Sequence, residues 1–151
     1  MRNVILLTVM LLGVSSICRA QNNPVKWNYS AEKLDDRTYE IHMTASIADG
    51  WHIYAQQQPK DAISLPTKIR FNKNPLVRME GVPTEFGKKE KYSIEALGIE
   101  QYQYAGKVDF VQRVELRAPG AKISLSGSIA FQACTDEMCL PAAEMQFNVA
   151  L

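Results

Sequence analysis

The sequence has almost no net charge and few residues that bind metals. Its 151 residues carry 17 Lys and Arg against 16 Asp and Glu, without a long basic run. This argues against nucleic-acid binding by neutralisation of the phosphate backbone. Its two histidines are not in a paired spacing that ligates a metal. We therefore expect no nucleic-acid partner, no metal and no other cofactor.

Long hydrophobic runs are absent except near the N-terminus. Residues 4–17 form an apolar stretch that follows Arg2 and precedes Ala20. This order is typical of an export signal, so residues 1–20 are predicted to be a signal peptide cleaved near Ala20. The alternatives are an uncleaved anchor and lipid attachment at Cys18, which the bulky preceding residue disfavours. We expect a periplasmic or secreted mature chain without a membrane span.

Cleavage at this point would leave two of the three cysteines, Cys134 and Cys139. It would also remove Arg2 and Arg19, so the mature net charge would be 15 minus 16, or -1. An even pair of cysteines in an exported protein predicts a disulfide between them.

Alternation of apolar and polar residues dominates the rest of the chain and is typical of half-buried strands. No stretch shows a helical apolar stripe of ten or more residues. The strands are predicted at residues 25–29, 39–47, 51–54, 67–71, 76–82, 108–116, 123–133 and 145–151. Residues 83–98, with several charges and two glycines, are predicted to form a long loop. We predict an all-β chain in which residues 21–151 form one immunoglobulin-like antiparallel β-sandwich.

The spacing of Cys134 and Cys139 leaves three interpretations open. A bridge that closes so short a loop stabilises a fold weakly, by about 2 kcal/mol. Such a bridge is expected to be exposed and exchangeable, which favours a redox role over a permanent staple. Zinc binding is the third interpretation, and it would require two further ligands.

Three motifs resemble the N-terminal periplasmic domain of the thiol:disulfide interchange protein DsbD, also known as the disulfide bond corrector family. They are GWHIY at residues 50–54, VDFVQ at 108–112 and FQACTDEMCLP at 131–141. The resemblance covers about residues 25–151. It implies an immunoglobulin-like domain whose cysteine pair takes electrons from a membrane-embedded partner and reduces disulfides in exported proteins.

The same resemblance implies roles for individual residues. Cys139 would form the mixed disulfide with a partner, and Cys134 would resolve it. His52 and Tyr54 would lie beside the pair. The expected partners are thioredoxin-like redox proteins and a membrane electron-conduit protein.

The family also shields its cysteines with a cap loop, in which an aromatic residue precedes a glycine. By position the match is EALG at residues 95–98, so Glu95 and Leu97 are the predicted cap residues, with Leu97 in place of the aromatic. A second match, TEFG at residues 84–87, would place Phe86 in the cap. The sequence ends at Leu151, without the transmembrane and thioredoxin-like domains of the full protein, so its electrons are expected to come from separate polypeptides.

The alternative function is a secreted immunoglobulin-like binding or adaptor module with a purely structural disulfide. An exchangeable pair would equilibrate with defined redox buffers, whereas a buried staple would not.

Overall fold

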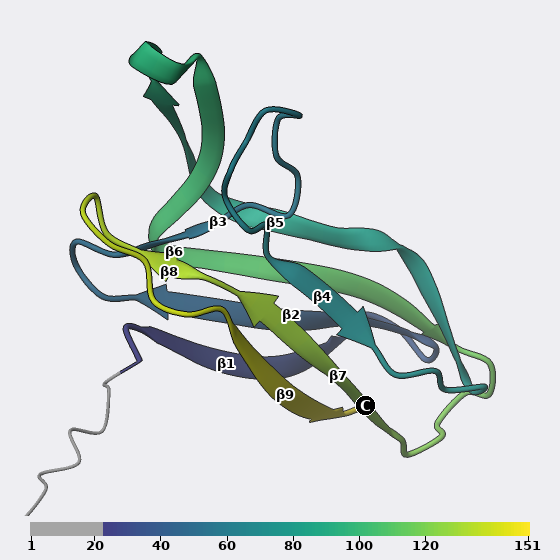
Figure 1. Ribbon diagram of the computed structural model, residues 1–151. Coiled ribbons are helices and arrows are strands. Elements are labelled where there is room, and N and C mark those ends of the chain that lie inside the picture. The colour runs from purple at the N-terminus through teal and green to yellow at the C-terminus, as the bar shows by residue number, and fades with distance from the viewer. Residues whose placement is uncertain (1–22) are drawn as a thin grey trace, which may run out of the picture.

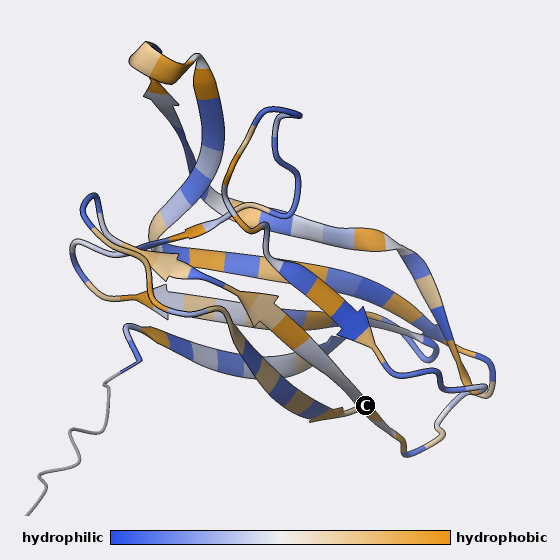
Figure 2. Ribbon diagram, viewed as in Figure 1, coloured by the Kyte–Doolittle hydropathy of each residue, from blue (hydrophilic) through white to orange (hydrophobic). Residues whose placement is uncertain are grey.

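The strands arise from the alternation of side chains, as β2 (Thr38–Ile47) illustrates. Ile41, Met43 and Ala45 are fully buried, whereas His42 and Thr44 between them remain partly exposed. Figure 2 shows the same alternation of apolar and polar residues along several strands. Because successive side chains of a strand point to opposite faces, one face of each sheet can cover a shared core. The computed structural model describes residues 23–151, which form an antiparallel β-sandwich (Figure 1).

The larger sheet is built around one long strand, β6. Its order is β1–β2–β6–β3–β8, and β5 pairs with the other edge of β6. The bounds of these strands are Val25–Lys33 for β1, His52–Tyr54 for β3, Val77–Ile94 for β5, Ile99–Leu116 for β6 and Ala133–Cys134 for β8. The short β3 therefore connects the central strand to the strand that carries the first cysteine of the pair.

The smaller sheet has the order β4–β7–β9 and packs over the larger one. Its strands are Lys68–Phe71 for β4, Ser124–Phe131 for β7 and Ala143–Ala150 for β9. The core between the sheets includes Phe110 from β6 and Ile129 from β7, both fully buried. The ring of Trp27 on β1 lies 5.4 Å from that of Phe131, so aromatic contacts also join the two sheets. The predicted all-β immunoglobulin-like sandwich is confirmed.

The prediction of a long loop at residues 83–98 is wrong. These residues continue β5 as far as Ile94, and a short 3-10 helix, η1 (Glu95–Leu97), joins β5 to β6. Gly98 ends this turn with φ 63°, a conformation that favours glycine. The predicted loop is instead the end of a β-hairpin, here called the distal hairpin (residues 89–104), which projects beyond the sandwich (Figure 1).

The sequence of the distal hairpin shows no regular alternation of apolar and polar residues. Most of its β5 residues are exposed or partly exposed, so no regular apolar face marks the strand in the sequence. The pairing of β5 with β6 also shifts between Glu80 and Thr84 and again between Gly87 and Lys89. Such bulges interrupt the period of two on which the prediction depended.

The predicted signal peptide, its cleavage near Ala20 and lipidation at Cys18 lie outside the described residues. Within residues 23–151, no helix has the length and apolar character needed to cross a bilayer.

Candidate functional site

Cys134 and Cys139 form a disulfide at one end of the sandwich, which confirms the predicted pairing. Cys134 ends β8, and residues 135–138, here called the cysteine loop, return the chain to Cys139. The loop is closed by a hydrogen bond of 2.7 Å from the Thr135 N–H to the Met138 carbonyl. The Leu140 N–H then donates to the Ala133 carbonyl at 2.9 Å, so both ends of the disulfide are held by backbone hydrogen bonds.

The two sulfur-bearing residues differ in their exposure. Cys134 is 1% exposed, because β3 pairs with β8 at this residue, whereas Cys139 is exposed. Cys139 is therefore the more accessible of the two, which is compatible with the role that the resemblance implies for it. A sulfur can be attacked only where a partner can reach it, so an incoming thiol meets Cys139 first.

His52 and Tyr54 lie on the same face of the larger sheet as the disulfide. His52 is the direct cross-strand partner of Cys134, and side chains of directly opposite residues point to one face. Their neighbours Ile53 and Ala133 alternate to the other face and belong to the sandwich core. The structure thus brings His52, Tyr54 and the cysteine pair together, as the family resemblance implied.

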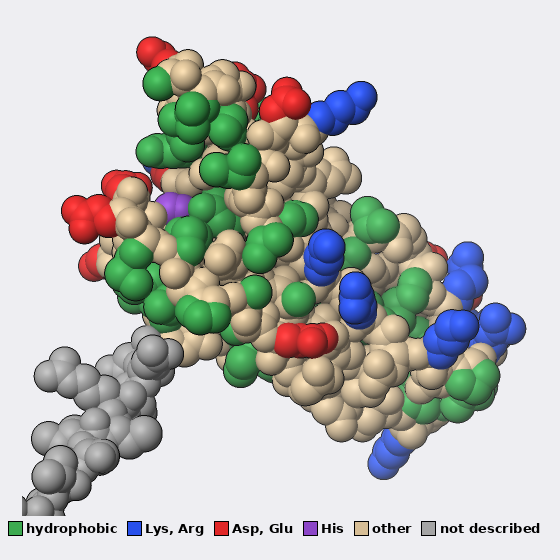
Figure 3. All heavy atoms as spheres, in the orientation of Figure 1, with side chains coloured by type: hydrophobic (Ala, Val, Ile, Leu, Met, Phe, Trp, Pro, Cys, Tyr) green, Lys and Arg blue, Asp and Glu red, His purple; other side chains and the backbone are tan. Residues whose placement is uncertain are grey.

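A cavity of about 260 Å³ opens beside Cys139, between the cysteine loop and the distal hairpin. His52 and Tyr54 of β3 line it together with Tyr92 and Ile94 of β5. Gln101 of β6 also lines it, and the cysteine loop forms the opposite wall. In Figure 3, acidic side chains gather around the loop and apolar side chains on the projecting hairpin. A partner that reaches Cys139 therefore meets an acidic rim and an apolar wall.

The polar groups in this cavity are only partly satisfied. Burial lowers the pKa of His52, while the charges of Asp136 and Glu90 act in the opposite direction. Burial also raises the pKa of Tyr54, whose hydroxyl lies 3.4 Å from His52 Nε2. Gln101 is 6% exposed, and its side-chain carbonyl oxygen has no hydrogen-bond partner.

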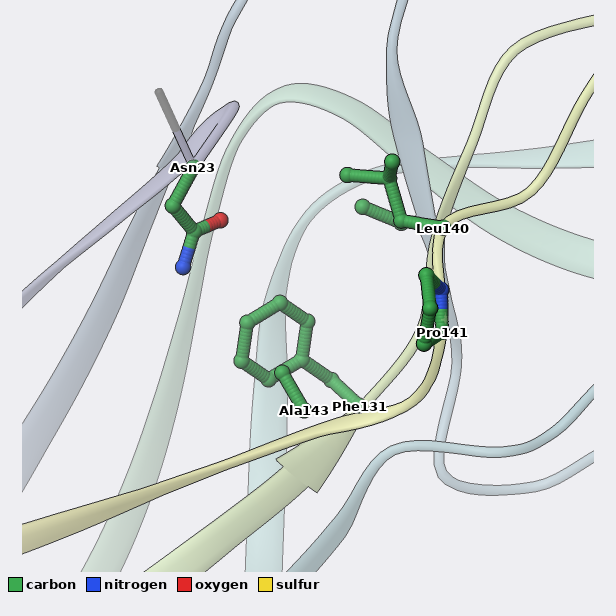
Figure 4. A pocket seen from close by; sticks show the side chains of 6 residues that line it. Asn23, Phe131, Leu140, Pro141 and Ala143 are labelled. Carbon is green, nitrogen blue, oxygen red and sulfur yellow. The ribbon is translucent and has the colours of Figure 1, made fainter. Parts of the chain in front are cut away.

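A second, apolar cavity of about 190 Å³ lies beside the segment that follows Cys139 (Figure 4). It is lined by Asn23, Phe131, Ala133, Leu140, Pro141 and Ala143. The side chain of Leu140 packs against the core cluster, which holds the chain directly after the exposed cysteine. Among residues 23–151, His, Cys, Asp and Glu side chains form no group of three or more that could hold a metal ion.

The sequence pattern of the family described as "Thiol:disulfide interchange protein DsbD, N-terminal" matches residues 20–151. The chain belongs to this family. No curated protein sequence matches the chain.

Solved structures of DsbD-type N-terminal domains share the fold. The reduced DsbD N-terminal domain of Neisseria meningitidis is 13% identical, with a TM-score of 0.51 over 84% of this chain and 85% of that one. The N-terminal periplasmic domain of ScsB from Proteus mirabilis is 16% identical, with a TM-score of 0.54 over 85% of this chain and 47% of that one. In a third structure, the DsbD N-terminal domain of Neisseria meningitidis is in complex with the PilB N-terminal domain; identity is 19% and the TM-score 0.50, over 81% of this chain and 80% of that one.

The predicted cap residues of this DsbD N-terminal family member lie at the tip of the distal hairpin. Glu95 and Leu97 belong to η1, and Leu97 is 65% exposed; neither residue lines the cavity beside Cys139. Phe86 is 59% exposed and lines a different hollow, near Arg113. The side chains that line the cavity from β5 are those of Tyr92 and Ile94, which the sequence analysis missed. Their spacing of two residues on one strand was a signal, but it lay inside the predicted loop.

Truncation of the hairpin residues tests which of them shields the cysteine pair. We expect Tyr92→Ala and Ile94→Ala to speed alkylation of Cys139 in the reduced protein by about two- to tenfold, because each removes a wall of the cavity. Leu97→Ala is the matched control on the same hairpin and tests the predicted cap. The rate of iodoacetamide labelling, followed by mass spectrometry, measures the effect. Faster labelling of the Leu97 variant alone would show that residues 95–98 shield the cysteine pair, as the resemblance implied.

Proposed function

We propose that this member of the DsbD N-terminal family is a periplasmic thiol:disulfide exchange domain. Family membership supports a general role in thiol:disulfide exchange. The observation that carries the proposal is the asymmetry of the pair: an exposed Cys139 at a cavity is bonded to a buried Cys134. A disulfide with one accessible sulfur can be opened by a partner and closed again from within.

The reaction transfers two electrons in two exchange steps. In the reduced domain, the Cys139 thiolate attacks a sulfur of the substrate disulfide, forming a mixed disulfide and releasing one substrate thiolate. The Cys134 thiolate then attacks Cys139 Sγ, which closes the Cys134–Cys139 bond and releases the second substrate thiolate. The two protons lost by the cysteines balance those taken up by the substrate thiols.

The proposed partners are proteins with exposed redox-active cysteines. The DsbD N-terminal domain of Neisseria meningitidis forms a complex with the PilB N-terminal domain. By analogy, we propose that thioredoxin-like proteins engage Cys139 here. A separate membrane electron-conduit protein would supply the electrons, and exported proteins would receive them.

A redox titration separates exchange from a structural role. Purified domain equilibrated in buffers of reduced and oxidised dithiothreitol should show a reversible two-electron transition of the pair. The fraction of free thiols is measured by alkylation under acid-quenched conditions and mass spectrometry. A pair that stays oxidised until the fold itself unfolds would instead indicate a binding module with a structural disulfide.

A further inference from the structure

The resolving step requires Cys134 to lose its proton, although its thiol is buried. Cys134 is 1% exposed, so water has little access to remove its proton. The thiolate, not the thiol, is the nucleophile in exchange, and burial in apolar surroundings disfavours the thiolate. The resolving step therefore requires a proton acceptor inside the protein.

His52 is placed to be this acceptor. It pairs directly with Cys134 across β3 and β8, which puts the Cβ atoms of the two residues about 5 Å apart on one face. Its side chain also lines the cavity that Cys139 lines, so it adjoins both the buried thiol and the cavity that a partner bound to Cys139 would enter. The ring is itself buried, 7% exposed, and packs edge-on to Tyr54 at 5.3 Å.

We propose that His52 carries the proton of the resolving step, taking it from Cys134 Sγ and passing it to the partner thiolate that leaves Cys139. The inference rests on the proposed exchange function and deepens it. In this step the Cys134 S–H bond breaks and an imidazole N–H bond forms. The S–S bond to the partner breaks, the Cys134–Cys139 bond forms, and the imidazolium returns its proton to the partner sulfur. Atoms and electrons balance without any further reactant.

The surroundings keep the ring neutral between transfers. Burial lowers the pKa of His52, so the imidazole is unprotonated near neutral pH and free to accept a proton. The carboxylates of Asp136 and Glu90 partly offset this effect and stabilise the imidazolium once it forms. The titratable groups around the ring come from its own strand, the distal hairpin, the cysteine loop and the pair itself: Tyr54, Glu90, Tyr92, Asp136, Glu137, Cys134 and Cys139.

The two exchange steps can be followed separately with dithiobis-nitrobenzoate as the disulfide substrate. The reduced domain should release one thionitrobenzoate when Cys139 attacks and a second when Cys134 resolves. We expect His52→Gln to slow the second release by about tenfold or more near neutral pH while changing the first by less than about twofold. The difference should shrink only well above about pH 8.5, the usual pKa of an exposed thiol, because hydroxide then competes with His52 as the proton acceptor.

Matched variants define the outcomes. His42→Gln replaces the other histidine, which is bonded to Asp109 on a distant part of the sheet, and should leave both phases unchanged. Cys134→Ala should abolish the second release and so identify it as resolution. An unchanged second phase in His52→Gln, or an equal slowing at every pH, overturns the proton-carrier role while leaving exchange intact. A wild-type domain that releases no second thionitrobenzoate contradicts the exchange function itself.

Discussion

Cys134→Ala is expected to accumulate mixed disulfides with a thioredoxin-like partner, whereas Cys139→Ala should form none. In the first variant the exposed Cys139 can still exchange with the partner, but the domain has no second thiol to resolve the mixed disulfide. In the second variant the remaining thiol, that of Cys134, is buried where β8 pairs with β3, so a partner cannot reach it. The expected contrast is a major trapped species against none.

The trapping experiment mixes the reduced Cys134→Ala domain with a thioredoxin that keeps only its exposed active-site cysteine, bound as a disulfide to thionitrobenzoate. Attack by Cys139 then releases thionitrobenzoate, and the thioredoxin has no second thiol to reverse the step. Non-reducing electrophoresis and mass spectrometry of the cross-linked peptide measure the product. The double variant lacking both cysteines is the control for non-specific cross-linking. Equal trapping by both single variants would show that a partner also reaches Cys134. It would contradict the assignment of Cys139 as the attacking thiol and Cys134 as the resolving one.

The sequence predicted the parts of this site that follow a regular pattern. The strands that carry His52 and Cys134 were predicted from short apolar segments, and their residues Ile53 and Ala133 belong to the core. The even pair of cysteines predicted the disulfide. Pro141, which cannot donate a hydrogen bond to a strand, follows shortly after the exposed Cys139. For these residues, the local sequence was sufficient to predict their position in the fold.

The distal hairpin could not be predicted in the same way. Its strands pair with each other outside the sandwich, so no buried face imposes a period of two on β5. Tyr92 and Ile94 line the cavity together with the cysteine loop, which is more than 40 residues away along the chain, so their position depends on the tertiary fold. Gln101 is a polar residue that a sequence pattern would place on an exposed face, yet the cavity wall buries it.

The base of the distal hairpin is held by a partly buried carboxylate, Glu85. One of its oxygens accepts the Gln56 N–H at 2.6 Å, and the other accepts the Tyr104 hydroxyl at 2.8 Å. Lys89 Nζ lies 2.9 Å from the same oxygen as Tyr104. These contacts join the loop after β3 to β5 and β6 at the point where the pairing shifts, so they fix the direction in which the hairpin leaves the sheet.

Glu85→Ala is therefore expected to lower the free energy of unfolding by about 1–3 kcal/mol, because it leaves the partly buried Gln56 N–H and Tyr104 hydroxyl without their acceptor. It should also speed alkylation of Cys139, since the hairpin loses its anchor. Glu40→Ala removes an exposed ion pair with Arg113 and is the matched control, expected to cost less than about 1 kcal/mol. Urea unfolding of the reduced and oxidised domains measures both variants. A Glu85 variant as stable as the control would show that the hairpin is held by its strand pairing alone.

The difference in free energy of unfolding between the wild type and Glu85→Ala should depend on pH, because it depends on whether the Glu85 carboxyl is ionised. Burial raises the pKa of Glu85, but the bonds from Gln56, Lys89 and Tyr104 outweigh it, so the pKa of the folded state is lowered below its usual value. A group with a lowered pKa in the folded state stabilises it above the unfolded pKa, and this contribution is lost as pH falls through the folded value. The stability gap between the wild type and Glu85→Ala should thus be largest near neutral pH and narrow below about pH 4. A gap that stays constant from neutral to acid pH would mean that the carboxylate charge does not hold the hairpin, and that the side chain acts there through its volume.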